Sequence, residues 1–126
     1  MNLIALSRGD AAWLASAYAA CFSSSWSLEA FATLLEKGAR ALGMQSAGTN
    51  AGFILYRAAA EEAEILTLVV LPPCRRQGVA KALMEAMFLE LEEKKVKYVF
   101  LEVGVENHAA IGLYHRCGFE TVGKRP

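Results

Sequence analysis

The 126 residues are 55% hydrophobic, and 13 basic side chains balance 13 acidic ones, so the formal net charge is zero. This length fits one domain, residues 1–126, with a real hydrophobic core, and the composition excludes a disordered chain. The zero net charge excludes tight binding to nucleic acid through neutralised phosphates, whereas a basic peptide remains a compatible partner. Cys21, Cys74 and Cys117 are far apart and fit neither a metal site nor a disulfide framework, so we interpret them as thiols of a reducing cytosol.

Strand and helix patterns alternate along the chain and predict a mixed α/β domain. In chain order we expect a strand at 3–6, helices at 10–22 and 27–37, a hairpin with arms at 41–45 and 52–57 around residues 48–50, a strand at 64–71, a helix at 78–95, a strand at 98–103, a helix at 107–117, and the start of a strand at 119–123. Pro72 and Pro73 end the strand at 64–71 because proline cannot donate to the ladder. The β–α–β unit predicts a parallel pair of strands behind an antiparallel front half.

The helix boundaries carry suitable capping residues. Asp10, Ser27 and Asn107 are good N-caps, and Gly118 is a good helix stop. The apolar stretch at 11–22 has 12 residues, too few to cross a bilayer, which needs roughly 20. We therefore interpret it as a core-facing helix, and we expect a cytoplasmic protein without membrane association.

The turn at 75–80, Arg-Arg-Gln-Gly-Val-Ala, follows an apolar strand and opens an amphipathic helix. The unpaired N–H groups of a first helical turn converge on one point, where the helix dipole adds positive potential. Gly78 lets the backbone approach a bulky phosphate closely. The turn lacks the Lys-Ser/Thr ending of a triphosphate-binding loop, and it has one glycine where the dinucleotide motif has three. It therefore predicts another phosphorylated cofactor, gripped mainly by backbone.

Two matches to a known family narrow the identity of this cofactor. Arg75, Gly78 and Ala80 fit the pattern Arg/Gln-x-x-Gly-x-Gly/Ala and resemble the acetyl-CoA pyrophosphate loop of the GNAT N-acetyltransferases. The region that follows is similar to the closing half of the same superfamily, through Leu101-Glu102-Val103, Asn107, Ala109-Ala110-Ile111, Leu113-Tyr114 and Gly118-Phe119. Within the superfamily these motifs resemble the ribosomal-protein-alanine N-acetyltransferases. The resemblance covers residues 64–123, with a weaker likeness around Trp26.

The resemblance implies a three-layer α/β (α+β) fold, in which helices cover both faces of a central mixed, mostly antiparallel sheet. The resembled enzymes continue with a turn and a further strand after the position of Pro126. Either this sequence stops short of that strand or the protein does without it, and in both cases we expect a GNAT-like sheet without its C-terminal strand over residues 1–126. Because that strand helps to form the substrate groove, its absence affects acceptor specificity more than cofactor binding.

The resemblance also implies where acetyl-CoA binds. The phosphates are expected on the backbone of Arg76, Gln77, Gly78, Val79, Ala80 and Lys81. The thioester carbonyl is expected on backbone groups of Leu68, Val69 and Val70. There the strand should bulge and splay from the strand at 98–103, so that the pantetheine arm pairs with its edge like an added strand. Asn107 should contact the cofactor arm as well as cap its helix. No metal is implied.

Glu102 is the candidate base, since only a deprotonated amine attacks a thioester. It lies between two apolar residues near the end of an apolar strand, where burying a charge is costly, and desolvation there would raise its pKa. An outward-facing surface carboxylate is the alternative interpretation. The base acts on the amine directly or through a water molecule.

Tyr114 is the candidate acid, because a phenol with a pKa near 10 can protonate a leaving thiolate and stay neutral at working pH. A purely structural tyrosine is the alternative. His108 and His115 match no catalytic position of the family, and His115 points about 100° away from Tyr114 on a helix. Trp26 is either a buried structural residue or part of the acceptor groove.

These residues predict transfer of acetyl from acetyl-CoA to the α-amino group of a protein N-terminus, with an N-terminal alanine of a small-subunit ribosomal protein as the expected acceptor. An α-amino group with a pKa near 8 needs only a modest base. Two alternatives remain open. One is an acetyltransferase for another amine, such as a lysine, a polyamine or an antibiotic. The other is a non-catalytic acyl-CoA-binding module.

Overall fold

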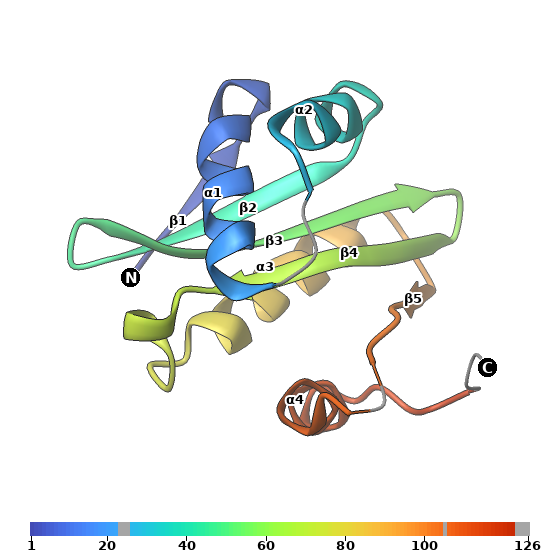
Figure 1. Ribbon diagram of the computed structural model, residues 1–126. Helices are drawn as coiled ribbons and strands as arrows, with labels where there is room; N and C mark the ends of the chain where they lie inside the picture. The colour runs from blue at the N-terminus through green and yellow to red at the C-terminus, as the bar shows by residue number, and fades with distance from the viewer. Residues whose placement is uncertain (23–25, 105, 123–126) are drawn as a thin grey trace.

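The computed structural model describes residues 1–22, 26–104 and 106–122, and in this part of the chain helices pack on a five-stranded sheet (Figure 1). The strands are β1 (Asn2–Leu6), β2 (Arg40–Ser46), β3 (Thr49–Ala59), β4 (Glu62–Val70) and β5 (Tyr98–Phe100), and they lie in this order across the sheet. Neighbouring strands are antiparallel except for β4 and β5, which are parallel. The predicted mixed, mostly antiparallel sheet is therefore confirmed.

Helices lie on both faces of this sheet. The α-helices are α1 (Ala11–Cys21), α2 (Leu28–Glu36), α3 (Val79–Glu93) and α4 (His108–Arg116), with short 3₁₀ turns at Arg8–Asp10 and Pro72–Cys74. Alternate residues of β3 enter two separate cores, because successive side chains of a strand point to opposite faces. Phe53 and Leu55 pack with residues of α1 and α2, whereas Ile54 and Tyr56 pack with residues of α3. This arrangement confirms the three layers.

The crossover from β4 through α3 to β5 determines where the sheet opens. Pairing between β4 and β5 covers only three positions, from Glu62↔Tyr98 to Glu64↔Phe100. Beyond Glu64, β4 continues to Val70 beside β3 but has no ladder with β5. A register shift against β3 leaves Leu66 opposite no residue, so the bulge precedes the predicted position at 68–70. The splay of the two strands is present as predicted.

The caps predicted at Ser27, Asn107 and Gly118 are confirmed, whereas Asp10 precedes α1 without a side-chain hydrogen bond to that helix, because its carboxylate accepts from the Ser7 N–H over 2.9 Å. The Ser27 hydroxyl accepts a hydrogen bond from the Ala30 N–H over 3.1 Å at the start of α2. The Asn107 side chain accepts one from the Ala110 N–H over 3.2 Å at the start of α4. Gly118, with φ of 97°, follows the end of α4 as a helix stop. A positive φ of this size favours glycine because a side chain would clash with the backbone.

Three predictions depart most from the structure. The hairpin turn lies at 47–48, so Thr49 and Asn50 belong to β3 and not to the turn. The strand expected at 98–103 ends at Phe100, where its pairing with the diverging β4 ends. The strand expected from residue 119 is absent over 119–122, where no neighbouring strand pairs with it, and residue 123 lies outside the described residues.

Candidate active site

A cleft of about 860 Å³ lies where the open end of β4 meets α3 and α4. Figure 1 shows α4 beyond the β4 edge of the sheet and the start of α3 close to the end of β4. The predicted site residues that line the cleft come from all three elements: Leu68, Val69, Val70, Arg76, Gly78, Val79, Ala80, Lys81, Asn107 and Tyr114. The fold therefore gathers most of the predicted site into one space.

The turn before α3 presents free backbone N–H groups to this cleft. Gly78 is the N-cap of α3 with φ of 81° and ψ of 12°, and Arg76 also has a positive φ, of 64°. Gly78 provides no side chain to cap the helix, so the first N–H groups of α3 keep their capacity to bind an anion. Val79 is buried and anchors the helix start in the core. The turn thus offers backbone donors that could bind an anion, on a packed base.

The open edge of β4 forms a second wall of the cleft. The Leu71 N–H donates to the Ala51 carbonyl of the β3 side over 2.9 Å, and a Cβ built on Gly52 would lie within 2.2 Å of the Val69 oxygen. The backbone groups of Val69 and Leu71 therefore face β3. By the alternation of a strand, those of Leu68 and Val70 face the opposite edge, where β5 has diverged.

Tyr114 closes the cleft from α4. Its ring packs edge-on against Phe119 with centroids 5.8 Å apart, and Phe119 lies 6.0 Å from Phe88 of α3. Burial raises the pKa of Tyr114 above its usual value of 10, and the nearby Cys117 thiol adds to the shift. The phenol therefore stays protonated across the neutral range and can donate a proton or a hydrogen bond.

Two predicted site residues do not line the cleft. Glu102 is exposed, in the irregular segment after β5, so the burial expected from its apolar neighbours is wrong. The reason is that β5 ends two residues earlier and no strand ladder holds Glu102 against the sheet. Gln77 is also exposed, and its side-chain amide donates to the Pro73 carbonyl over 3.5 Å. Gln77 therefore contributes its backbone, and not its side chain, to the turn.

A family profile and the similarity to known proteins agree with this arrangement. The profile of the Acetyltransferase (GNAT) family matches residues 11–119. The chain belongs to the GNAT acetyltransferase family. The chain is 38% identical over 96 residues, 75% of its length, to the [ribosomal protein bS18]-alanine N-acetyltransferase of Escherichia coli (strain K12), and it spans 64% of that relative. The crystal structure of the ribosomal-protein-S18-alanine N-acetyltransferase from Escherichia coli superposes with a TM-score of 0.90 at 28% identity, covering 97% of this chain and 79% of that one.

A mycobacterial GNAT relative gives a similar match. The N-alpha-acetyltransferase RimI of Mycobacterium tuberculosis (strain ATCC 25618 / H37Rv) is 33% identical over 88 residues, which make up 67% of this chain and 54% of that protein. The chain thus spans less than two thirds of the length of these curated relatives. The family match over residues 11–119 includes the residues that line the cleft of this GNAT domain.

Several cleft residues of this GNAT domain were not assigned to the site from the sequence, although some of them belong to the matched motifs. They are Cys21 and Phe22 at the end of α1, Arg75 in the turn, and Ala109, Ala110, Leu113, Arg116 and Cys117 on α4. Ala110 and Cys117 had a usable signal, because residues three or four positions from Tyr114 share its helix face. Cys21 had none: its thiol lies 3.7 Å from the Val70 carbonyl, 49 positions away in the chain.

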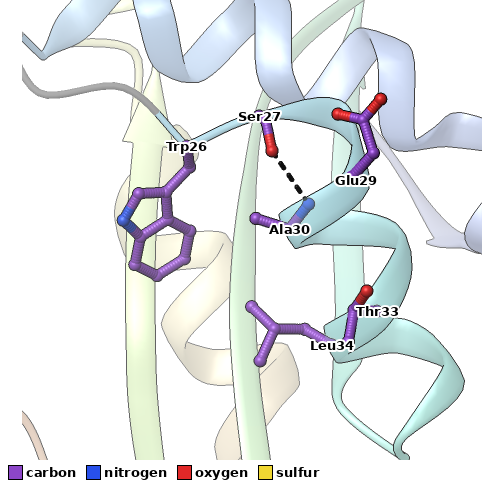
Figure 2. A pocket seen from close by; sticks show the side chains of 6 residues that line it. All are labelled: Trp26, Ser27, Glu29, Ala30, Thr33 and Leu34. Atoms are coloured by element: carbon purple, nitrogen blue, oxygen red, sulfur yellow. Dashed lines mark hydrogen bonds between the residues drawn. The ribbon is translucent and has the colours of Figure 1, made fainter.

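A second, shallow groove runs along α2 of the GNAT domain. Figure 2 shows the Trp26 ring opposite Ala30 and Leu34, while Ser27 caps the helix. Trp26 also stacks on Tyr18 with ring centroids 5.3 Å apart. It is therefore half-buried, with one part in the aromatic core and another along the groove.

Neither a metal centre nor a membrane helix occurs in the residues that the structure describes. No three His, Cys, Asp or Glu side chains among them lie close enough together to hold a metal ion. None of the described helices is both long and apolar enough to span a bilayer.

Proposed function

We propose that this protein is an acetyl-CoA-dependent N-acetyltransferase that modifies the α-amino group of a protein N-terminus. The proposed acceptor is an N-terminal alanine of a small-subunit ribosomal protein. The observation that carries the proposal is the cleft itself, which joins the glycine turn of α3, the open edge of β4 and the protonated Tyr114. The relatives named as bS18-alanine N-acetyltransferases support the acceptor.

The cleft fits the chemical parts of acetyl-CoA. The backbone of residues 76–81 offers N–H groups and the positive end of α3 to the pyrophosphate. The edge groups of Leu68 and Val70 suit the amide-containing pantetheine arm, because an extended arm can add to an open strand edge. Asn107 lies on the same cleft, and its cap to α4 uses the side-chain oxygen and leaves the amide N–H₂ for the arm. When bound, acetyl-CoA supplies the activated acetyl group.

Two side chains are proposed to move protons. Tyr114 donates a proton, or a strong hydrogen bond, to the departing sulfur, since burial keeps the phenol protonated. Glu102 removes the proton from the acceptor amine. Because Glu102 is exposed and does not line the cleft, this step runs through water and not by direct contact. An α-amino group has a pKa of about 7.7–8.0, so a relayed base of this kind suffices near neutrality.

The proposed acceptor also implies where in the cell the enzyme works and what its partner is. Ribosomal proteins are made in the cytoplasm, so we infer a cytoplasmic location. The partner is a protein N-terminus and not nucleic acid, because the chain has no net basic charge for phosphate binding.

The test is acetyl transfer to a peptide panel, with the mass of each peptide as the readout. The panel holds peptides that begin with Ala, Ser, Met and Gly, a blocked peptide with an internal lysine, and a polyamine. We expect a gain of one acetyl group on the Ala peptide and none on the blocked peptide. Transfer confined to the lysine peptide or the polyamine would assign another amine as acceptor. Binding of acetyl-CoA without transfer to any compound would support the non-catalytic module instead.

A further inference from the structure

Arg75, the first residue of the glycine turn, connects three separate segments. Its Nε donates to the Val70 carbonyl over 3.0 Å, and its Nη2 lies 3.6 Å from the Cys21 sulfur. The Cys21 thiol itself lies 3.7 Å from the same Val70 carbonyl. The end of α1, the end of β4 and the turn before α3 therefore meet at one carbonyl oxygen.

The Val70 carbonyl needs such donors. It faces the edge of β4 that β5 has left, so no strand supplies an N–H to it. A guanidinium is suited to this position because it is a rigid fork that can reach two acceptors, and a hydrogen bond from a charged donor is stronger than a neutral one. Arg75 itself is exposed, so its contacts add little to the stability of the fold.

Arg76 is a contrasting neighbour. It has a left-handed backbone and lines the same cleft, and its guanidinium has no hydrogen-bond partner among the residues that the structure describes. Its charge is therefore available to an anion, whereas the donors of Arg75 are directed to Val70 and Cys21.

We infer that Arg75 is a positioning residue that holds the end of β4 against the turn and does not bind the cofactor phosphates. This inference rests on the proposed function, in which the turn holds the pyrophosphate and residues 68–70 hold the thioester. Because the Val70 carbonyl is occupied, the edge offers the cofactor arm only the Val70 N–H and the N–H and carbonyl of Leu68. Arg75 thereby determines the position of the acetyl group when acetyl-CoA is bound.

The test compares alanine and lysine variants of the two arginines in the full chain. Arg75→Ala and Arg75→Lys should both lower kcat about 10-fold, since a small misplacement of reacting groups costs up to about 100-fold and a lysine lacks the fork. Their KM and Kd for acetyl-CoA should stay within about 3-fold of the wild type. Arg76→Ala should raise both constants, more at low salt than at high salt, and Arg76→Lys should restore them. Arg8→Ala, which removes an exposed ion pair with Glu36, is the matched control.

A second readout does not need turnover. Hydrogen exchange in the peptide covering residues 66–71 should speed up in both Arg75 variants and stay unchanged in the Arg76 variants, because only Arg75 contacts the end of β4. If the wild type binds acetyl-CoA but acetylates nothing, the proposed function fails, and hydrogen exchange and Kd still decide the role of Arg75.

Other results would overturn the inference. If Arg75→Ala raised the KM for acetyl-CoA and Arg75→Lys kept wild-type kcat and KM, Arg75 would be a phosphate ligand. If hydrogen exchange at residues 66–71 stayed unchanged in Arg75→Ala, the contact between Arg75 and the end of β4 would not exist in solution. Should the Arg75 variants fail to fold, Cys21→Ala replaces them: it should lower kcat about 2-fold with an unchanged KM, and a kcat equal to that of the wild type would contradict the three-way contact.

Discussion

The sheet with α1–α3 and the segment after β5 are held in place very differently. Helix α3 buries five side chains, whereas α4 has no fully buried side chain, since even Tyr114 is only half-buried, and β5 has three residues. Among the described residues of 101–104 and 106–122, Phe119 packs against Tyr114 of α4 and against Phe88 of α3. The proposed phosphate site thus stands on a packed base, while the proposed proton-transfer residues lie on a weakly anchored arm. Such arms open at lower free energy than a core does.

The largest expected change is a loss of stability when a side chain of the packed region is truncated. Leu83 is fully buried in α3, so Leu83→Ala should lower the free energy of unfolding by about 2–5 kcal/mol. Ile111 is only half-buried on α4, so Ile111→Ala should cost about 1 kcal/mol. Denaturant titration measures both values. Equal losses in the two variants would mean that α4 belongs to the same cooperative core.

Tyr114→Phe separates chemistry from packing on the arm. The ring and its contact with Phe119 remain, while the proton donor is lost. We expect kcat to fall by about 100-fold, the lower end of the range for general acid–base catalysis, with the Kd for acetyl-CoA unchanged. His115→Gln is the matched control, since His115 is exposed on the same helix and does not line the cleft. A Tyr114→Phe variant with wild-type turnover would leave tyrosine a structural role only.

Glu102→Gln should have a smaller effect with a distinctive pH dependence. An exposed base acting through water is expected to contribute about 10-fold, below the usual range for a base in direct contact. The loss should be largest near pH 6, where an acceptor amine with a pKa of about 8 is mostly protonated, and it should shrink towards pH 9. Glu106→Gln, a change of an exposed carboxylate in the same segment, is the control. A loss that is constant from pH 6 to 9 would argue against a base.

The same contrast explains what the sequence could and could not predict. The turn at 75–80 and the cap at Asn107 are local features, so the sequence located both correctly. The exposure of Glu102 depends on where β5 loses its partner, which is a property of the whole sheet. The contact between Cys21 and Val70 joins residues 49 positions apart and needs the complete fold. Local structure was therefore predictable, whereas long-range placement was not.

The smallest effect concerns a residue of the packed region at high pH. The Tyr56 hydroxyl is buried without a hydrogen-bond partner among the described residues, and burial, with the neighbouring Glu90 carboxylate, raises its pKa. The unfolded chain releases this proton near pH 10, before the folded protein does, so stability should decline above pH 10 by up to about 1.4 kcal/mol per pH unit for this group. Tyr56→Phe should make that decline shallower. At pH 7 it should change the free energy of unfolding by no more than about 1 kcal/mol, because the hydroxyl has no hydrogen bond of good geometry and the ring keeps its packing. The control is Tyr98→Phe, at an exposed position, which should leave the pH dependence of stability unchanged. If the wild type and Tyr56→Phe lost stability equally with pH, Tyr56 would ionise alike in the folded and unfolded states.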